Sequence, residues 1–460
     1  MSDQDAGPAC EMKADLETIT SLAKRRGFVF PSAEIYGGFA STYDYGPLGV
    51  EMRRNIRDSW WRWMVHGRDD VVGIEAAIVT NPAVWRASGH VDVFTDALVD
   101  CLECRARVRA DQIVDDTCPS CGAVGRFTQE RDFNLLLRTH VGPVEDESSA
   151  AYLRPETAQG MFVNFDNVLN STRRRLPFGI AQIGKSFRNE ITTGQFIFRT
   201  REFEQMEMEF FCEPSSGELW YEYWRQERMR WYRSLGLREK HLRLRNHAPE
   251  ELSHYSKATA DIETHYPWGW TELEGVAYRG DYDLKAHTEH SGKPLTYFDP
   301  QSNEHLVPHV VEPAAGVDRV MLALLMDAYD EDIVADETRV LLRLAPDVAP
   351  VAVAVLPLSR NERLVPTARR VWDVLRPHFR SAYDDAQSIG RRYRRQDEIG
   401  TPLCVTVDFD TLDDDAVTIR DRDTTTQVRV GVSVLIEVLR ERLNELCPAT
   451  EAAPAAPAAP

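Results

Sequence analysis

The sequence lacks any apolar segment long enough to cross a membrane. Its longest apolar stretch of note, residues 320–326, is far shorter than the ~20 residues that a transmembrane helix requires. The first 17 residues mix acidic and polar side chains and have no basic-then-apolar pattern of a secretion signal. We therefore expect a cytoplasmic protein with no membrane partner.

Basic residues are also in deficit. The 460 residues include 54 Lys and Arg against 73 Asp and Glu, which gives a formal net charge of −19. Proteins that coat nucleic acid non-specifically neutralise phosphates with an excess of basic side chains, so this composition disfavours that class. Basic patches at 173–175 and 390–395 leave two interpretations open, a specific RNA contact and a solvated surface.

Cysteine is sparse outside one segment. Four of the eight cysteines are scattered, and in a cytoplasmic setting we expect them to be reduced and mostly buried or inert. The other four form two C-x2-C pairs, at 101–104 and 118–121, thirteen residues apart. This spacing predicts a zinc ion held by four thiolates, with two disulfides or idle thiols as alternatives. Four protein ligands leave no position for water, so we expect structural Zn²⁺. The scattered cysteines are Cys10, Cys212, Cys404 and Cys447, and the predicted ligands are Cys101, Cys104, Cys118 and Cys121.

Hydrophobic patterning divides the chain in two. Residues 1–345 alternate helical segments with long strand-like runs, and the zinc knuckle, about 99–125, interrupts them as an insertion. After a short linker at 347–350, residues 346–447 show a buried strand at 351–356, a helix from 362, further strands at 403–407 and 416–419, and a final helix with leucines at 435, 439, 443 and 446. This order predicts a small α/β domain. Residues 448–460 are rich in Ala and Pro, and we expect them to be disordered.

Two segments read as amphipathic strands with an unusual polar face. In residues 181–190 and 197–210, alternation places Gln182, Ser186, Arg188 and Glu190, and then Arg199, Arg201, Phe203, Gln205, Glu207 and Glu209, on one side. Paired antiparallel, they offer guanidinium groups for phosphate, a ring for a base and carboxylates for an amine. The alternative is an amphipathic hairpin whose polar side meets water. A phenylalanine between arginines favours a binding site.

A third segment ends a strand and begins a helix. Residues 306–310 read as strand, and an apolar stripe from Val317 to Ala328 then predicts a buried helix. Gly316 and Arg319 lie in its first turn, where backbone N–H groups and a guanidinium can both bind phosphate.

These segments resemble the motifs of class II aminoacyl-tRNA synthetases. Residues 187–190 with 201–203 resemble motif 2, residues 312–319 resemble motif 3, and residues 72–82 resemble motif 1, the dimer-forming element. Further stretches, at 23–28, 43–49, 153–160, 188–211, 272–277 and 390–407, are similar to glycyl-tRNA synthetases of the homodimeric type. The resemblance covers nearly the whole chain apart from both ends.

The resemblance implies a fold and an activity. The fold would be an α+β class II catalytic domain built on an antiparallel sheet with helices, a small zinc-knuckle insertion, and a C-terminal α/β anticodon-binding domain. The activity would be that of a glycine–tRNA ligase, which activates glycine with ATP and Mg²⁺ to glycyl-adenylate and transfers it to the 3′ end of tRNA(Gly). The implied partners are glycine, tRNA(Gly) and a second copy of the chain.

The resemblance also implies roles for single residues. Arg188, Glu190 and Arg319 would be catalytic, Glu156 and Glu207 would bind the glycine ammonium, and Arg279 would neutralise its carboxylate. Glu272 and Glu312 are candidates for the magnesium side. The ATP-binding positions are Arg188, Asn189, Glu190, Phe198, Arg199, Thr200, Arg201, Glu202, Phe203, Glu272, Leu273, Gly316, Val317, Asp318 and Arg319. The glycine-binding positions are Arg109, Glu156, Phe203, Glu204, Gln205, Met206, Glu207, Arg279, Glu312, Pro313, Ala314, Ala315 and Gly316.

One position departs from the family pattern. Many relatives have a serine where this chain has Ala314, so one hydrogen bond to glycine must be missing or replaced.

Two other functions are alternatives. A non-catalytic relative is disfavoured because Arg188, Glu190, Phe203 and Arg319 are all present. A zinc-knuckle nucleic-acid-binding protein without chemistry would leave motifs 2 and 3 unexplained.

Overall fold

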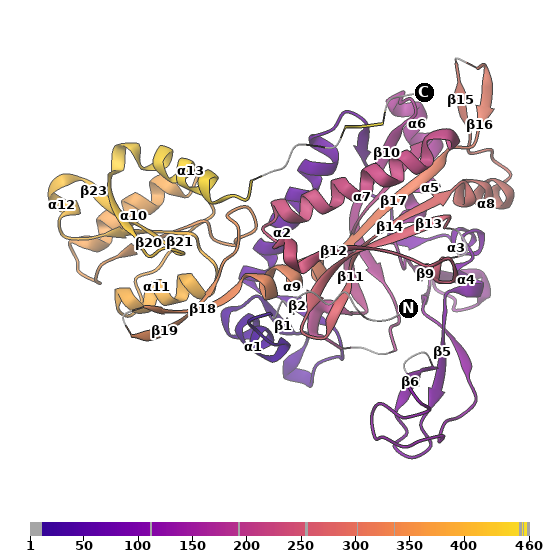
Figure 1. Cartoon of the computed structure of the whole chain (residues 1–460), viewed down its shortest axis with the longest axis horizontal. Coiled ribbons are helices and arrows are strands. Elements are labelled where there is room, and N and C mark those ends of the chain that lie inside the picture. The colour runs from indigo at the N-terminus through magenta and orange to yellow at the C-terminus, as the bar shows by residue number, and fades with distance from the viewer. Residues whose placement is uncertain are drawn as a thin grey trace.

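The computed structural model describes residues 12–110, 113–191, 194–253, 256–300, 302–334, 336–449, 453 and 455–457. Figure 1 shows a large body built around a long twisted sheet, a smaller domain formed by the C-terminal part of the chain, and a slender projection that carries β5 and β6. Among the described helices, none is long and apolar enough to cross a membrane. Most of the tail predicted to be disordered, residues 450–452, 454 and 458–460, lies outside the described residues.

The large body is organised around a seven-stranded sheet. Its strands follow the order β12-β13-β14-β17-β11-β10-β3, and each neighbouring pair is antiparallel except β10 and β3. The predicted antiparallel sheet is therefore confirmed for six of these strands. The bounds are β3 Val71–Gly73, β10 Phe178–Phe187, β11 Glu202–Cys212, β12 Leu242–Asn246, β13 Ala258–Tyr266, β14 Gly269–Gly280 and β17 His309–Gly316.

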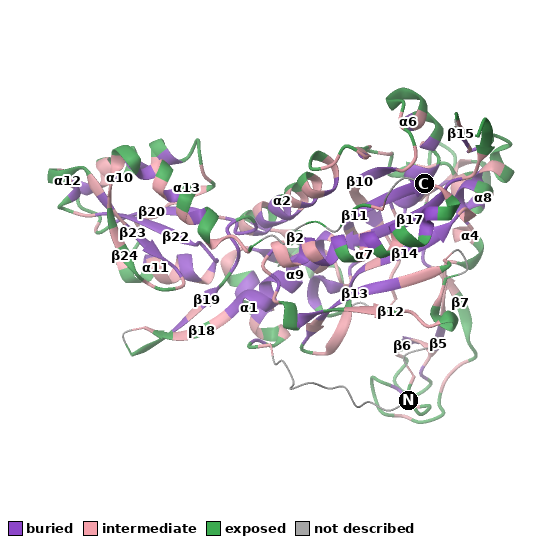
Figure 2. Ribbon diagram, turned by 45° about the horizontal axis from the view of Figure 1, so that its top comes forward, coloured by how far each residue is buried: buried purple, intermediate pink, exposed green. Residues whose placement is uncertain are grey.

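Helices cover one face of this sheet and bury its apolar side chains. Met206, Met208 and Phe210 of β11 are fully buried, as alternation predicts. The ring of Phe210 packs 4.5 Å from Trp220 of α7, and the apolar stripe of α9 is buried in the same core. The covering helices are α1 Leu16–Arg26, α2 Pro47–Trp61, α7 Gly217–Ser234 and α9 Val317–Ala328. Figure 2 shows that buried residues follow the central strands and the inner sides of these helices.

A second apolar cluster closes one end of the opposite face. Phe162 and Phe165 pack there against Phe178 and Phe211 of the sheet. This cluster limits the polar part of that face to a central area. The helices near it are α3 Pro82–Ala87, α4 His90–Val93, α5 Ala158–Phe162, α6 Phe165–Thr172 and α8 Tyr282–Ser291.

The four-cysteine segment projects from the large body. It lies between strands of a three-stranded sheet of order β6-β5-β7, and its loops are largely exposed in Figure 2. The strands are β5 Thr95–Asp100, β6 Arg107–Arg109 and β7 Arg131–Asn134. The remaining short strands of the large body are β1 Val29–Pro31, β2 Tyr43–Tyr45, β4 Val79–Thr80, β8 Leu137–His140, β9 Ala150–Leu153, β15 Tyr297–Asp299, β16 Glu304–Leu306, β18 Tyr329–Val334 and β19 Glu337–Leu342.

The C-terminal domain has its own sheet and its own core. The sheet order is β21-β20-β22-β23-β24, with β20 parallel to β21 and β22 and the other pairs antiparallel. Its final helix buries Leu435, Leu439 and Leu443 against the sheet, as its leucine spacing predicts. The elements are β20 Val353–Pro357, α10 Leu364–Leu375, β21 Ser381–Tyr383, α11 Ile389–Glu398, β22 Leu403–Val407, α12 Thr411–Asp414, β23 Ala416–Asp421, β24 Gln427–Gly431 and α13 Leu435–Leu446.

Charged side chains join the two domains. Arg339 of β19 lies 3.3 Å from Asp397 of α11, and both side chains are 1% exposed. Arg420 of β23 also donates to Asp397, at 2.8 Å. Arg420 belongs to the same domain as Asp397, so, of these two contacts, the one between Arg339 and Asp397 links the two domains.

Candidate active site

The open face of the sheet carries its polar side chains in register. Glu207 on β11 lies opposite Ala314 on β17, which lies opposite Gly275 on β14, which in turn lies opposite Asp261 on β13. Opposed residues in antiparallel strands share a face, so this row crosses four strands on one side of the sheet. Acidic side chains stand at both ends of the row, and small residues occupy its middle.

The small residues form the floor of a cavity of about 380 Å³. A Cβ atom built on Gly275 would meet nothing within 4 Å, which confirms that space lies above this strand. The volume falls within the range of ~300–1,000 Å³ that is usual for small-molecule sites. The lining residues are Glu156, Arg188, Glu190, Ile197, Phe198, Arg199, Thr200, Phe203, Gln205, Glu207, His247, Ser253, Ser256, Thr259, Asp261, Glu272, Leu273, Gly275, Ala277, Glu312, Ala314, Ala315, Gly316, Asp318 and Arg319.

One part of the cavity combines arginines with aromatic rings. The guanidinium of Arg188 lies 5.2 Å from the centre of the Phe203 ring, and its Nε donates to the carbonyl of Pro155 at 3.0 Å. Arg319, in the first turn of α9, lies 4.5 Å from the ring centre of Phe198. This combination suits a nucleotide, because the guanidinium groups can bind phosphate and the aromatic rings can stack on a base.

Carboxylates accompany these arginines. Glu272 lies 3.2 Å from Arg319, and Glu190 lies 3.8 Å from Arg199. The positive charge of Arg319 lowers the pKa of Glu272, so Glu272 is ionised at neutral pH. An ionised carboxylate beside a phosphate-binding arginine is a suitable ligand for Mg²⁺.

The other part of the cavity gathers buried glutamates. Glu207 is 3% exposed and its Oε2 accepts the backbone N–H of Thr157 at 3.0 Å. Burial, with repulsion from Glu312 and Glu156, raises the pKa of Glu207 to about 8. Carboxylates crowded in this way favour a cationic ligand, because a positive charge removes their mutual repulsion. The site therefore suits a small ammonium group.

Glu156 belongs to the same part of the cavity but differs in its partners. His90 of α4 lies 3.2 Å from it, and the side chain of Gln159 donates to it at 3.0 Å. Burial opposes its ionisation, but His90 and Arg279 outweigh this effect and hold the pKa of Glu156 well below its usual range. Glu156 is therefore an ionised acceptor at neutral pH.

Several residues that sequence reasoning did not include support these groups. The Nδ1 of His90 lies 2.8 Å from the hydroxyl of Ser88, and Phe94 lies 5.4 Å from the guanidinium of Arg188. His90 and Phe94 come from a segment with no recognisable motif, so no sequence signal pointed to them. His247, Thr259 and Asp261 line the far side of the cavity and were also not anticipated.

The two predicted strands leave a longer connection between them than expected, which moves some residues. β10 ends at Phe187 and β11 begins only at Glu202, while residues 196–198 form a short 3-10 helix. Gln195 and Phe196 have positive φ angles of 58° and 57°, as suits the predicted turn, and the short helix that follows delays the start of the second strand. The predictions of continuous strands at 181–190 and 197–210 are therefore wrong at the turn between them.

Arg201 precedes the first residue of β11 and does not follow the strand alternation. It donates to the carbonyl of Ala40 at 2.7 Å and lies 5.5 Å from the ring centre of Phe39, so the structure places it outside the cavity lining. Alternation also turns Glu204 to the helical side, where Arg53 and Arg57 each donate to it at 3.0 Å. The other predicted positions outside the lining are Arg109, Asn189, Glu202, Met206, Arg279, Pro313 and Val317.

The placement of two predicted arginines differs from their expected roles. Arg279 is 3% exposed, donates to both oxygens of Asp283 at 2.7 and 2.8 Å, and donates to Glu312 at 2.7 Å. Arg109 lies on β6 of the projection, 3.2 Å from Asp96. Arg279 therefore acts on the cavity through Glu312, and its predicted direct contact with a substrate carboxylate does not fit this arrangement.

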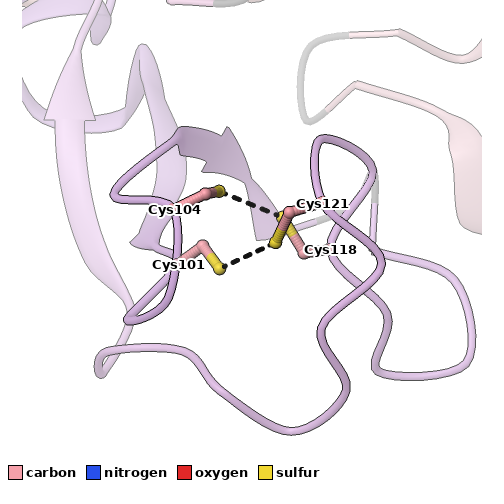
Figure 3. A group of neighbouring side chains, drawn as sticks. All are labelled: Cys101, Cys104, Cys118 and Cys121. Carbon is pink, nitrogen blue, oxygen red and sulfur yellow. Dashed lines mark hydrogen bonds between the residues drawn. The ribbon is translucent and has the colours of Figure 1, made fainter.

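The four cysteines of the projection come together as their spacing predicts. Their Sγ atoms all lie within 4.8 Å of one another, with 3.7 Å between Cys101 and Cys121 and 3.8 Å between Cys104 and Cys118 (Figure 3). All four are free thiols, which disfavours the alternative of two disulfides. Four thiolates at ~2.3 Å from a tetrahedral zinc ion would lie ~3.8 Å apart. The cluster therefore fits Zn²⁺.

Comparison with known protein families agrees with this geometry. The family described as "tRNA synthetase class II core domain (G, H, P, S and T)" matches residues 143–328, and the family described as "Anticodon binding domain" matches residues 352–442. The chain is 55% identical over 457 residues to the glycine–tRNA ligase of Streptomyces coelicolor, covering 94% of this chain and 99% of that protein. It is 54% identical over 452 residues to that of Thermobifida fusca, covering 93% and 98%. It is 53% identical over 461 residues to that of Caldanaerobacter subterraneus, covering 94% and 99%.

Proposed function

Because the chain belongs to the glycine–tRNA ligase family of class II aminoacyl-tRNA synthetases and is an ATP-dependent ligase that joins glycine to tRNA, we propose that both reaction steps take place in the cavity above Ala314 and Gly275. The observation that carries this proposal is the meeting of two environments in one cavity. Arginines and rings form one part, and buried glutamates form the other. ATP and glycine need these two environments side by side.

Glycine enters the glutamate part with its ammonium first. Glu207 and Glu156 accept hydrogen bonds from the ammonium, and Glu312 lies with Glu207 in the same cluster. The glycine carboxylate then faces the arginine part. Arg188 is well placed to receive it, since its Nε is anchored on Pro155, the residue before Glu156.

ATP occupies the arginine part. Its adenine ring stacks on Phe203, Glu190 accepts from the adenine amine, and Arg188 and Arg319 bind phosphate oxygens. Mg²⁺ would be held by Glu272 together with the phosphates, and would supply neutralisation of phosphate charge. Glu312 fits the ammonium site better than the magnesium site, because Arg279 already binds one of its oxygens.

The first step joins the two substrates. A glycine carboxylate oxygen attacks the α-phosphorus of ATP, and pyrophosphate leaves. A carboxylate is already ionised at neutral pH, so this step needs no general base. The residues act by alignment and by charge: Arg188 contacts both the attacking carboxylate and the α-phosphate, and Arg319 stabilises the charge on the leaving group. In the second step, the terminal ribose hydroxyl of tRNA attacks the glycyl carbonyl, and AMP leaves.

The anticodon of tRNA would be read by the C-terminal domain, which matches the anticodon-binding family. We assign residues 1–345 to catalysis and 346–447 to this domain. The chain is proposed to act in the cytoplasm as a homodimer. Val50 of α2 and Val79 of β4 are 42% and 48% exposed. Exposed apolar side chains of this kind support the burial of this surface against a second copy of the chain.

Zinc is proposed for the four-cysteine projection. Its ligands are complete without water, so the ion would hold the two loops together and take no part in the reaction.

The proposal is tested by charging tRNA with radioactive glycine. Wild-type protein with ATP and Mg²⁺ should form glycyl-tRNA, and Arg188→Ala should lose activity by several hundred-fold because a cation in contact with both substrates is gone. Arg201→Ala provides the matched control, since Arg201 lies outside the cavity lining and should leave the rate within a few-fold. Equal loss in the two variants would contradict the proposed site.

A further inference from the structure

One buried carboxyl group next to the glutamate part of the cavity has no role in the reaction described above. Glu209 lies two residues beyond Glu207 on β11, and continuing the β11–β17 register places it opposite Glu312. Its side chain is fully buried, and one of its carboxylate oxygens lies within 4.8 Å of one oxygen of Glu207 and one of Glu312. Glu209 is absent from the cavity lining, whereas Glu207 and Glu312 are part of it.

The three glutamates differ in what their oxygens contact. Glu207 accepts a hydrogen bond from the backbone of Thr157, and Glu312 accepts one from Arg279. Within the described residues, no N–H or hydroxyl group donates to either oxygen of Glu209, and the carboxylate of Glu312 is a polar neighbour. An ionised carboxylate buried in this way would lack any donor and would be repelled by the neighbouring carboxylates, a combination that strongly disfavours the ionised form.

A protonated carboxyl group resolves both difficulties. It carries no charge, and its O–H can donate to a neighbouring carboxylate, as happens when two acids share one proton. Burial, followed by repulsion from Glu312, raises the pKa of Glu209 well above its usual range. A proton on Glu209 also agrees with its position at the border of the apolar cluster around Phe211.

Building on the proposed glycine site, we propose that Glu209 is a positioning residue, whose protonated carboxyl group donates a hydrogen bond to Glu312 and holds that carboxylate in place for the glycine ammonium. Glu312 is then fixed from two sides, by Glu209 and by Arg279, which donates at 2.7 Å. Neutral Glu209 also limits the negative charge of the cluster. Glycine has no side chain, so its affinity depends on the exact direction of a few charged hydrogen bonds.

Two substitutions test whether Glu209 acts as a neutral hydrogen-bond donor or as an ionised group that binds glycine. Glu209→Gln keeps the shape and supplies an N–H in place of the O–H, so KM for glycine should stay within about threefold of wild type. Glu209→Met keeps the length but cannot donate, so KM for glycine should rise about tenfold or more, the effect of losing a hydrogen bond to a charged acceptor. KM for ATP should change little in both variants. Glu207→Gln serves as the control, and it should weaken glycine strongly.

Glycine-dependent ATP–pyrophosphate exchange gives both Michaelis constants, and thermal melting reports folding. The melting temperature of Glu209→Met should fall only modestly, because Glu312 loses one buried donor but keeps Arg279. If Glu209→Gln raises KM for glycine as much as Glu207→Gln does, Glu209 is an ionised ligand and the inference is wrong. It is also wrong if Glu209→Met leaves KM for glycine unchanged. Wild-type exchange in the same assay tests the proposed function separately, since only its absence would contradict glycine activation itself.

Discussion

The substitution Glu207→Gln separates the two substrates of the proposed site. It keeps the size of the side chain and an oxygen for Thr157, which donates its backbone N–H at 3.0 Å, but removes the negative charge. A hydrogen bond to a charged group contributes ~1.5–3 kcal/mol, so KM for glycine should rise about 10- to 100-fold. KM for ATP should change less than twofold, because the arginine part of the cavity is untouched.

The same variant that binds glycine more weakly should be more stable than the wild type at neutral pH. The pKa of Glu207 is raised from its ordinary 4.5 to about 8 in the folded protein, with burial the main cause. Between these two values the folded state holds a proton that the unfolded chain has released, so wild-type stability falls as pH rises. Glutamine does not titrate. The stability of Glu207→Gln relative to wild type should therefore increase by about 3 kcal/mol between pH 5 and pH 7.

Pyrophosphate exchange at varied glycine and ATP measures the first effect, and urea unfolding at the two pH values measures the second. Glu202→Gln is the matched control, since Glu202 lies on the same strand, pairs with Lys185 at the surface and is absent from the cavity lining. An equal rise in both Michaelis constants for Glu207→Gln would refute its role in binding glycine. A stability difference that does not change with pH would refute the raised pKa.

Three further predictions follow from the same geometry. Ala314→Ser places a hydroxyl on the cavity floor and should change KM for glycine by less than about threefold in either direction. A much larger rise in KM, measured by pyrophosphate exchange, would show that glycine does not bind above Ala314 as proposed. Because glycine binding requires ionised Glu207, whose pKa is about 8, KM for glycine should fall as pH rises from 6 to 8, and this slope should be absent in Glu207→Gln. Cys118→Ser should release zinc, measured by elemental analysis, and lower the melting temperature, whereas Cys404→Ser, a change at a buried thiol in the C-terminal domain, should leave the zinc content at one per chain.

The sequence predicted those parts of the site that depend on local pattern. Alternation placed Phe203, Gln205 and Glu207 on one face of β11, and the structure finds all three in the cavity lining. The spacing of the cysteines predicted their cluster, because two short loops can bring four thiols together without distant contacts. The stripe of α9 predicted a buried helix for the same reason.

Other parts of the site depend on which side chains meet across the fold. Arg279 has a charge suited to a substrate carboxylate, but Asp283, four residues further along the chain in the first turn of α8, binds its guanidinium instead. His90 comes close to Glu156 only through the fold, because α4 and residue 156 are far apart in the sequence. Glu209 shares a face of β11 with Glu207, so the strand pattern alone would make it a second binding residue. Its burial and lack of a donor become visible only when β17 lies beside β11.

The most direct test of the central claim is ATP–pyrophosphate exchange with single amino acids. Purified protein with Mg²⁺ should catalyse exchange with glycine and should give at most a small fraction of that rate with alanine or serine, since a side chain would have to enter the cluster of Glu207 and Glu312. The Arg188→Ala variant should lose this exchange. No exchange with glycine, or a higher rate with alanine or serine, would contradict the assignment of the cavity to glycine and ATP.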